Sequence, residues 1–252
     1  MMRKSVLVTG GAKRVGAAMC RRFAQAGWHV AIHCNTSVDA AQALADDLPS
    51  AQVVQCDLLD LDAAVEMVRQ LAAELEDWRC LINSASIFDP DDVTALDIET
   101  NQKAMRINAA SPALLAQAYF AHARSHAGLR VIQVTDQKLA NLNPDFFSYT
   151  MSKAAADIAA QMLAMVHNGA DRVYTLAPGA ILPSHDQSSE EAERSHKLNL
   201  LERQTAGREV ADGALFLAEG PLASGQALYV DSGQHLLNQP RDVIYLEREG
   251  GT

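Results

Sequence analysis

The sequence lacks an excess of positive charge. Its formal net charge is -10 at pH 7, whereas nucleic acids and anionic membranes need a basic surface on the protein that binds them. Long apolar runs are missing too, since no stretch reaches the roughly 18 residues that a bilayer-spanning helix needs. Lys13 and Arg14 follow directly on a short apolar run, which argues against a signal peptide. We therefore expect a cytoplasmic protein that binds neither nucleic acid nor membrane.

Cysteine is sparse, and no pair has metal-site or C-x-x-C spacing. The four cysteines are Cys20, Cys34, Cys56 and Cys80. Each falls in a segment predicted to be a helix or a strand, so we expect buried thiols in a reducing compartment. No metal site is predicted. Apolar residues make up 48% of the 252 residues, which is enough to bury the full core of one α/β domain.

Short apolar runs alternate with helical periodicity along the chain. Strands are expected at residues 5–9, 29–34, 52–56, 80–83, 131–135, 172–176 and 227–230. Helices are expected at 15–26, 38–48, 60–75, 102–108, 111–122, 148–166 and 210–219, with a loop at 87–101. The alternation predicts an α/β fold of the Rossmann type, a doubly wound seven-stranded parallel sheet with helices on both faces. Residues 1–252 are expected to form this single domain.

Two segments stand outside the alternating pattern. Residues 182–203 are polar and include His185 and Asp186, and we expect them to form a helical flap over a pocket. A tail begins at about residue 238, and its sequence has no pattern that indicates a role.

A glycine-rich turn follows the first expected strand. Gly10, Gly11 and Gly16 stand where that strand passes into a helix, so backbone N–H groups there can hold the pyrophosphate of a dinucleotide. The alternative is a turn that is merely structural. Lys13 and Arg14 lie at the start of the helix, where a cation is disfavoured unless an anion is present; a solvated Arg14 is the other interpretation.

The end of the second expected strand indicates which dinucleotide binds. An enzyme that uses NAD has Asp or Glu here to bond the ribose hydroxyls, whereas this chain has Asn35, Thr36 and Ser37. No carboxylate would repel a 2'-phosphate, and hydroxyl and amide groups could bond it. We therefore expect the cofactor to be NADP(H).

Tyr149 and Lys153 are four residues apart in the expected helix 148–166. Residues at this spacing lie on one helix face, and an ammonium close to a phenol favours the phenolate and lowers its pKa. The pair is thus expected to act in acid catalysis. Taken alone, the same spacing also occurs on solvated helix faces.

In chain order, the Thr9-Gly10 turn, Asn83-Ser84-Ala85-Ser86, Asn108, Tyr149-x-x-x-Lys153 and Pro178-Gly179 together resemble the short-chain dehydrogenase/reductase family over about residues 4 to 235. The resemblance implies that Tyr149, Lys153 and Asn108 are catalytic, with Asn108 holding a water next to the lysine. It also implies a homotetramer. The implied cofactor-binding residues are Gly10, Lys13, Arg14, Val15, Asn35, Thr36, Ser37, Asp57, Leu58, Ser84, Ala85, Ser86, Tyr149, Lys153, Pro178, Gly179 and Ile181. For Asp57, capping of the next helix is the alternative.

Asp136 occupies the position where the family usually has serine. A carboxylate would repel a developing alkoxide but favours a protonated or N–H-bearing ring. Together with Arg14, Ser86 and Phe88, it resembles the pteridine reductase and dihydromonapterin reductase branch of the family. In that branch the aromatic ring would stack on a flat pterin, so the implied substrate contacts are Arg14, Ser86, Phe88, Asp136 and Tyr149.

These residues predict an NADPH-dependent reductase that transfers hydride to a pterin C=N bond, with Tyr149 as proton donor. Phe88 could instead simply cover the loop, and Ser86 could bond only backbone. The rival enzyme is an NADPH-dependent carbonyl or 3-oxoacyl reductase. The rival of another class is a regulatory protein that binds NADP(H) without turnover.

Overall fold

A seven-stranded sheet forms the framework of the computed structural model, which describes residues 3–181 and 187–250. The strand order is β3-β2-β1-β4-β5-β6-β7, and every neighbouring pair is parallel. The strands are β1 (Ser5–Val8), β2 (His29–Cys34), β3 (Ala51–Gln55), β4 (Trp78–Asn83), β5 (Arg130–Val134), β6 (Arg172–Pro178) and β7 (Ala227–Val230). The predicted doubly wound parallel sheet is confirmed.

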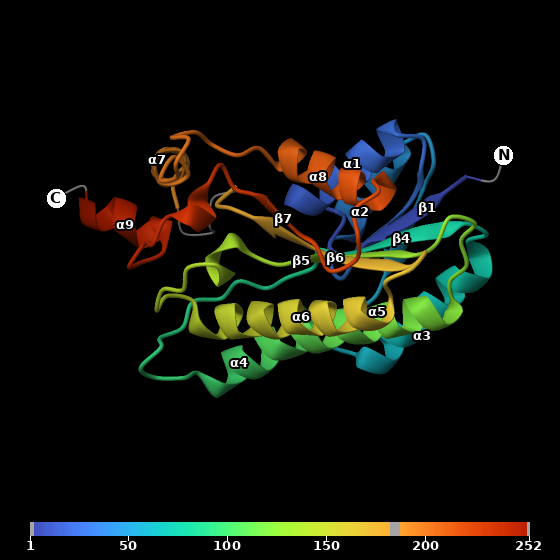
Figure 1. Cartoon of the computed structure of the whole chain (residues 1–252), viewed down its shortest axis with the longest axis horizontal. Coiled ribbons are helices and arrows are strands. Elements are labelled where there is room, and N and C mark those ends of the chain that lie inside the picture. The colour runs from blue at the N-terminus through green and yellow to red at the C-terminus, as the bar shows by residue number, and fades with distance from the viewer. Residues whose placement is uncertain (1–2, 182–186, 251–252) are drawn as a thin grey trace.

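Helices cover both faces of the sheet (Figure 1). One layer contains α1 (Arg14–Gln25), α2 (Val38–Asp46) and α8 (Gly207–Glu219). The other contains α3 (Leu61–Glu74), α4 (Ile98–Ala104), the π-helical turn η1 (Met105–Ala110), α5 (Ser111–His122) and α6 (Phe147–Val166). None of the helices described is long and apolar enough to cross a membrane.

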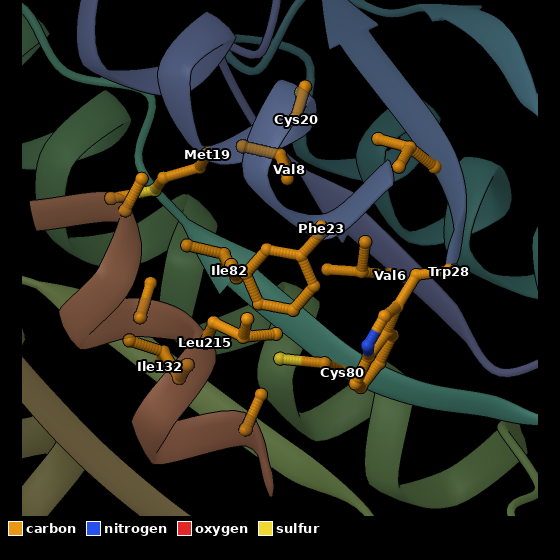
Figure 2. Close-up of a cluster of buried hydrophobic side chains, with 14 of the residues drawn as sticks. Val6, Val8, Met19, Cys20, Phe23, Trp28, Cys80, Ile82, Ile132 and Leu215 are labelled. Atoms are coloured by element: carbon orange, nitrogen blue, oxygen red, sulfur yellow. The ribbon is translucent and has the colours of Figure 1, made fainter. Parts of the chain in front are cut away.

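The central strand β1 shows why the sheet is buried on both sides. Val6, Leu7 and Val8 have no exposed surface, because a parallel strand with helices on both faces must be apolar at every position. Figure 2 shows one face of this core, where Phe23 of α1 meets Trp28 edge to face with ring centroids 5.0 Å apart. Full burial of each such side chain contributes about 1.5–3 kcal/mol to the free energy of folding. The buried core therefore stabilises the sheet whose carboxyl ends carry the candidate site.

The segment after β4 differs from the prediction. Residues 98–101 were expected in a loop, yet α4 begins at Ile98 and continues through η1 into α5 without a break. Asp97 starts the helix by accepting a hydrogen bond from the Thr100 N–H. The prediction failed because α4 is short and its first turn is largely exposed, so it has little apolar periodicity.

Two short helices stand beyond the carboxyl edge of the sheet (Figure 1). They are α7 (Ser189–Ser195), from the predicted flap, and α9 (Val243–Gly250), from the tail whose role the sequence did not indicate. Residues 182–186 of the predicted flap, His185 and Asp186 among them, lie outside the described residues. The four cysteines are unpaired and buried, as expected.

Candidate active site

A cavity of about 380 Å³ opens at the carboxyl ends of the strands, where the strand order reverses between β1 and β4. Ligands of open α/β sheets bind at this switch point. Predicted site residues that line the cavity are Gly10, Lys13, Arg14, Val15, Ser84, Ala85, Ser86, Phe88, Asp136, Tyr149, Lys153, Pro178, Gly179 and Ile181. Those that do not line it are Asn35, Thr36, Ser37, Asp57, Leu58 and Asn108.

The glycine turn at the cavity mouth has no room for side chains. A Cβ on Gly16 would lie 2.2 Å from the Gly10 carbonyl oxygen, and Gly10 itself has a φ of +65°. The backbone therefore passes close to the cavity, as it must where a pyrophosphate approaches main-chain N–H groups at a helix start. Arg14 also adopts a positive φ of 54°, so this turn is held in a conformation that non-glycine residues rarely adopt.

His33 of β2 holds the glycine turn through a hydrogen bond to its backbone. Its Nδ1 accepts a hydrogen bond from the Gly10 N–H at 3.1 Å, and its Nε2 lies 3.1 Å from the Cys56 carbonyl oxygen. Since Nδ1 accepts, Nε2 carries the proton and donates it, so the ring is neutral. Burial lowers the pKa of His33 to about 4. No local sequence pattern marks His33, because its role depends on contacts between neighbouring strands.

Four predicted cofactor-binding residues lie outside the cavity, after strands β2 and β3. Asn35 and Thr36 are exposed directly after β2, and Ser37 is half-buried at the start of α2, where its side chain makes no capping bond. Asp57 is exposed after β3 and accepts from the Leu59 N–H at 2.9 Å.

Asp60, and not Asp57, caps the following helix α3. The alternative interpretation of Asp57 as a helix cap is therefore wrong. Its neighbour Leu58 is buried, with 5% of its surface exposed.

Asp136 and Tyr149 meet at the inner end of the cavity. The Tyr149 hydroxyl donates to Asp136 Oδ2 at 2.7 Å, while Asp136 Oδ1 accepts from the Lys138 N–H at 2.8 Å. Asp136 lies two residues beyond the end of β5, and Tyr149 lies in the first turn of α6. The carboxylate is therefore held in place by one backbone bond and presents its second oxygen to the phenol.

The predicted effect of Lys153 on Tyr149 is wrong. The pKa of the Tyr149 phenol is raised well above its usual value, chiefly by burial and then by the charge of Asp136 and the hydrogen bond to it. Lys153 Nζ lies 5.6 Å from the Tyr149 ring centroid and donates to the Val134 carbonyl oxygen at 3.0 Å. Burial lowers the pKa of Lys153 to about 8. Burial and the carboxylate together therefore raise the pKa in spite of the nearby ammonium, and the phenol keeps its proton at neutral pH.

Asn108 acts on the loop beside the cavity. Its Oδ1 accepts from the Ile87 N–H at 2.9 Å, and its Nδ2 donates to the Ile87 carbonyl oxygen at 3.0 Å and to Ser152 Oγ at 2.9 Å. It sits in η1, and single π-helical turns of this kind often mark functional sites. These bonds fasten the loop that carries Phe88 to α6. The predicted water beside Asn108 stays a prediction.

Phe88 belongs to an aromatic cluster around Tyr149. Its ring stacks on Phe146 with centroids 4.0 Å apart and meets Tyr149 edge to face at 4.6 Å. Both alternatives for this loop thus have support, since Phe88 lines the cavity and also packs against its neighbours. Ser86 is exposed, and its Oγ lies 3.3 Å from the Ile87 carbonyl oxygen.

The cavity includes further residues that the sequence analysis did not single out. Lys138, Gln187, His196, Gln234, Asp242, Val243 and Ile244 all line it. Three of these belong to the C-terminal tail, more than 90 positions from Tyr149 in the sequence. No local pattern could have placed them at the site, because their position depends on long-range packing.

Known proteins similar to this chain share its fold over nearly its whole length. The alternative dihydrofolate reductase 1 (FolM) of Brucella suis, solved in complex with NADP, is 35% identical with a TM-score of 0.87, over 92% of this chain and 95% of that one. Dihydromonapterin reductase of Escherichia coli strain K12 is 24% identical over 92% of this chain and 96% of its own length.

An angucycline C-6 ketoreductase, LanV, solved with bound NADP, is 25% identical with a TM-score of 0.83, over 93% of this chain and 96% of that one. The family model described as enoyl-(acyl carrier protein) reductase matches residues 10–235. That match covers most of the chain, including the glycine turn and the Tyr149–Lys153 helix, and the protein therefore belongs to the short-chain dehydrogenase/reductase family.

Proposed function

We propose that this protein is an NADPH-dependent reductase that transfers hydride to a C=N bond of a dihydropterin, with Tyr149 as the proton donor. The observation that carries the proposal is the 2.7 Å hydrogen bond from the Tyr149 hydroxyl to Asp136. A carboxylate at this point distinguishes the site from one built around a neutral serine hydroxyl. The similarity to the Brucella and Escherichia coli reductases supports the same substrate class.

The residues around the cavity fit NADP(H). Gly10, Gly16 and the start of α1 can hold the pyrophosphate, and Lys13 and Arg14 add positive charge there. No carboxylate follows β2 to repel a 2'-phosphate, and Thr36 is exposed at that point. When bound, the reduced nicotinamide supplies the hydride. The relatives solved with NADP support this choice of cofactor.

Asp136 decides which double bond the site favours. Reduction of a ketone builds negative charge on oxygen, and a carboxylate beside the catalytic phenol would oppose that charge. Reduction of a C=N bond proceeds more easily when the nitrogen is protonated, and the same carboxylate stabilises that positive charge. Asp136 therefore favours a ring nitrogen over a carbonyl oxygen at the position next to Tyr149.

Tyr149 and Lys153 then have separate roles. Because its pKa is raised, the Tyr149 phenol holds its proton at neutral pH and can donate it to the reacting nitrogen. Lys153 carries a positive charge below about pH 8 and lies in the same buried region. Its charge offsets that of Asp136 while the phenol proton leaves. Phe88 would lie against the flat ring of the substrate, since its side chain lines the cavity beside Tyr149.

The rival function is reduction of a carbonyl group, and the similarity to the angucycline ketoreductase favours it. The deciding experiment follows loss of NADPH absorbance with dihydrobiopterin, dihydromonapterin, dihydrofolate and a panel of ketones and 3-oxoacyl thioesters. The proposal expects turnover with at least one dihydropterin and far slower turnover with every carbonyl compound. Faster reduction of a carbonyl compound would overturn it, and tight NADPH binding without any turnover would favour a regulatory protein.

We propose further that the protein is a homotetramer. Helix α6 exposes a row of apolar side chains on the face away from the sheet, and they are Met151, Ile158, Met162 and Met165. Their spacing places them on one side of the helix, where an exposed apolar row is typical of a protein interface. Light scattering should give four times the mass of the chain, and Met162→Lys should lower it. A monomeric wild-type protein would contradict this assembly.

A further inference from the structure

The C-terminal tail contributes a wall of the cavity. Asp242, Val243 and Ile244 line it, and Ile244 is buried with only 7% of its surface exposed. Ile244 packs in one cluster with Phe146 and Tyr149, so it touches the same group of side chains as the catalytic phenol. An apolar side chain from the C-terminal tail thus lines the cavity beside Tyr149.

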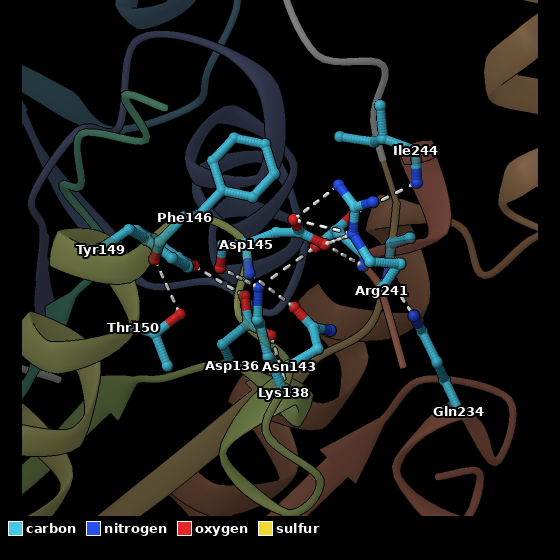
Figure 3. A network of polar contacts seen from close by, with 12 residues as sticks. Asp136, Lys138, Asn143, Asp145, Phe146, Tyr149, Thr150, Gln234, Arg241 and Ile244 are labelled. Carbon is cyan, nitrogen blue, oxygen red and sulfur yellow. Dashed lines mark hydrogen bonds and ion pairs between the residues drawn. The ribbon is translucent and has the colours of Figure 1, made fainter. Parts of the chain in front are cut away.

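An ion network holds this tail in place (Figure 3). The Arg241 guanidinium contacts both Asp145 oxygens, with Nε 3.0 Å from each and Nη2 2.9 Å from Oδ1. The Asp242 N–H donates to Asp145 Oδ2 at 2.7 Å, and the Asp242 carboxylate lies 3.6 Å from Lys138 Nζ. Bidentate contacts of this kind fix orientation as well as distance. We call Lys138, Asp145, Arg241 and Asp242 the tail clamp.

The tail clamp is joined directly to the catalytic helix. Lys138 is 3% exposed and also donates to the Asp145 carbonyl oxygen, and Asp145 immediately precedes Phe146. Phe146 has a φ of 54° at the start of α6, a backbone conformation that a bulky residue adopts only when its surroundings enforce it. The stacked Phe88 and the tail provide those surroundings. The position of the tail and that of Tyr149 are therefore set by the same contacts.

Helix α9 also connects to α7 of the flap. Arg194 Nε lies 2.5 Å from Glu247 Oε1, and Arg248 Nε lies 3.4 Å from Glu191 Oε1. His196, which follows α7 directly, lines the cavity and is 3% exposed. Two ion pairs therefore join α7 to α9 beside the cavity.

We infer that the tail of each chain is the specificity-determining wall of that chain's own active site, with Ile244 setting the width of the slot beside Tyr149. Arg241 and Asp145 are positioning residues that hold Ile244 there through the tail clamp. The slot then accepts a flat ring that lies between Phe88 and Ile244 and rejects bulkier molecules. The inference rests on the proposed function only for the choice of dihydropterin as the test substrate.

The first test changes the wall itself. Ile244→Trp should raise KM for the dihydropterin by about 10-fold or more, because the larger side chain would occupy space that the substrate ring needs. Its Kd for NADPH should stay within about twofold of the wild-type value, since the residues at the glycine turn are untouched. Leu246→Ala, in the same helix but not among the residues that line the cavity, is the matched control and should change neither. Unchanged KM for Ile244→Trp would overturn the inference.

The second test changes the clamp and does not depend on turnover. Quenching of bound NADPH fluorescence by acrylamide reports how well the tail covers the cavity. Arg241→Ala and Asp145→Asn should each increase quenching, the double variant should add little beyond either single change, and Arg241→Lys should restore part of the protection. Additive effects, or no change in quenching, would overturn the inference. If the wild-type protein reduces no dihydropterin but the quenching pattern holds, only the proposed function fails.

The third test asks whether the tail covers its own site or a neighbour's. Tyr149→Phe removes the proton donor, whereas Ile244→Trp raises KM but leaves the proton donor in place. If each tail serves its own chain, the active sites of the coexpressed protein are those of the Ile244→Trp chains, and KM for the dihydropterin stays at the raised value. A KM that returns to the wild-type value in the mixed protein would show exchange of tails between subunits and overturn the inference.

Discussion

Replacing Asp136 probes the carboxylate that is proposed to select a C=N bond. Asp136→Asn keeps an oxygen that can accept from the Lys138 N–H but removes the charge. Asp136→Ser introduces the residue that the family usually has. The bond to Tyr149 is 2.7 Å long and partly buried. A hydrogen bond to a charged group contributes about 1.5–3 kcal/mol, and each 1.36 kcal/mol is tenfold in rate. If the bond acts in the transition state, kcat/KM for a dihydropterin should fall roughly 10- to 150-fold.

The assay is NADPH oxidation with a dihydropterin and with a ketone, run side by side on the wild-type protein and both variants. Removal of the negative charge also takes away the Asp136 charge that raises the Lys153 pKa, so the decline of kcat/KM at alkaline pH should begin at a lower pH. Asp47→Ser, at an exposed carboxylate on the end of α2, is the control and should change nothing. Unchanged or faster pterin reduction by Asp136→Ser would refute the reasoning.

The glycine turn, the loop after β2 and the buried His33 and Lys153 give further predictions. Gly16→Ala should greatly weaken NADPH binding measured by fluorescence, because its Cβ would lie 2.2 Å from a carbonyl oxygen; at Gly207 a Cβ has no neighbour nearer than 3.8 Å, and Gly207→Ala should bind normally. Thr36→Asp should raise KM for NADPH about tenfold or more relative to NADH through repulsion of the 2'-phosphate. His33→Leu leaves the buried Cys56 carbonyl oxygen and the half-buried Gly10 N–H without their partner and should lower the free energy of unfolding in urea by about 1–3 kcal/mol, mainly through the carbonyl. Because burial lowers the His33 pKa from 6.5 to about 4, the unfolded wild-type chain binds the proton first, so wild-type stability should fall as pH drops through that window and the variant should lose this dependence. Since the Lys153 pKa is about 8, kcat/KM should decline as pH rises through that value.

The sheet could be predicted from sequence because its strands are continuous apolar runs. Val6, Leu7 and Val8 are fully buried, and such a run between turn residues has few other interpretations. The same holds for the glycine turn, where the close approach of Gly16 to Gly10 leaves no room for another residue. The local sequence determines the buried strands and the glycine turn, so both can be predicted from it.

The electrostatics of the site depend on distances that spacing alone does not give. The i, i+4 spacing puts Lys153 on the same helix face as Tyr149 but says nothing about the distance between charge and hydroxyl. Burial chiefly raises the Tyr149 pKa, and the partner that proved closest, Asp136, raises it further, so the direction of the shift was predicted wrongly. The contact of Arg241 with Asp145 was hidden for a related reason, since the two are 96 positions apart.

The most direct measurement of the central claim follows the hydride itself. NADPH carrying deuterium on the transferred position of the nicotinamide is incubated with the protein, a dihydropterin and a ketone together, and the products are analysed by mass spectrometry and NMR. The proposed function predicts one deuterium on the pterin carbon bonded to the reduced nitrogen, in a single stereochemical configuration, with little in the ketone product. Deuterium found on an alcohol carbon, with an unlabelled pterin, would contradict it.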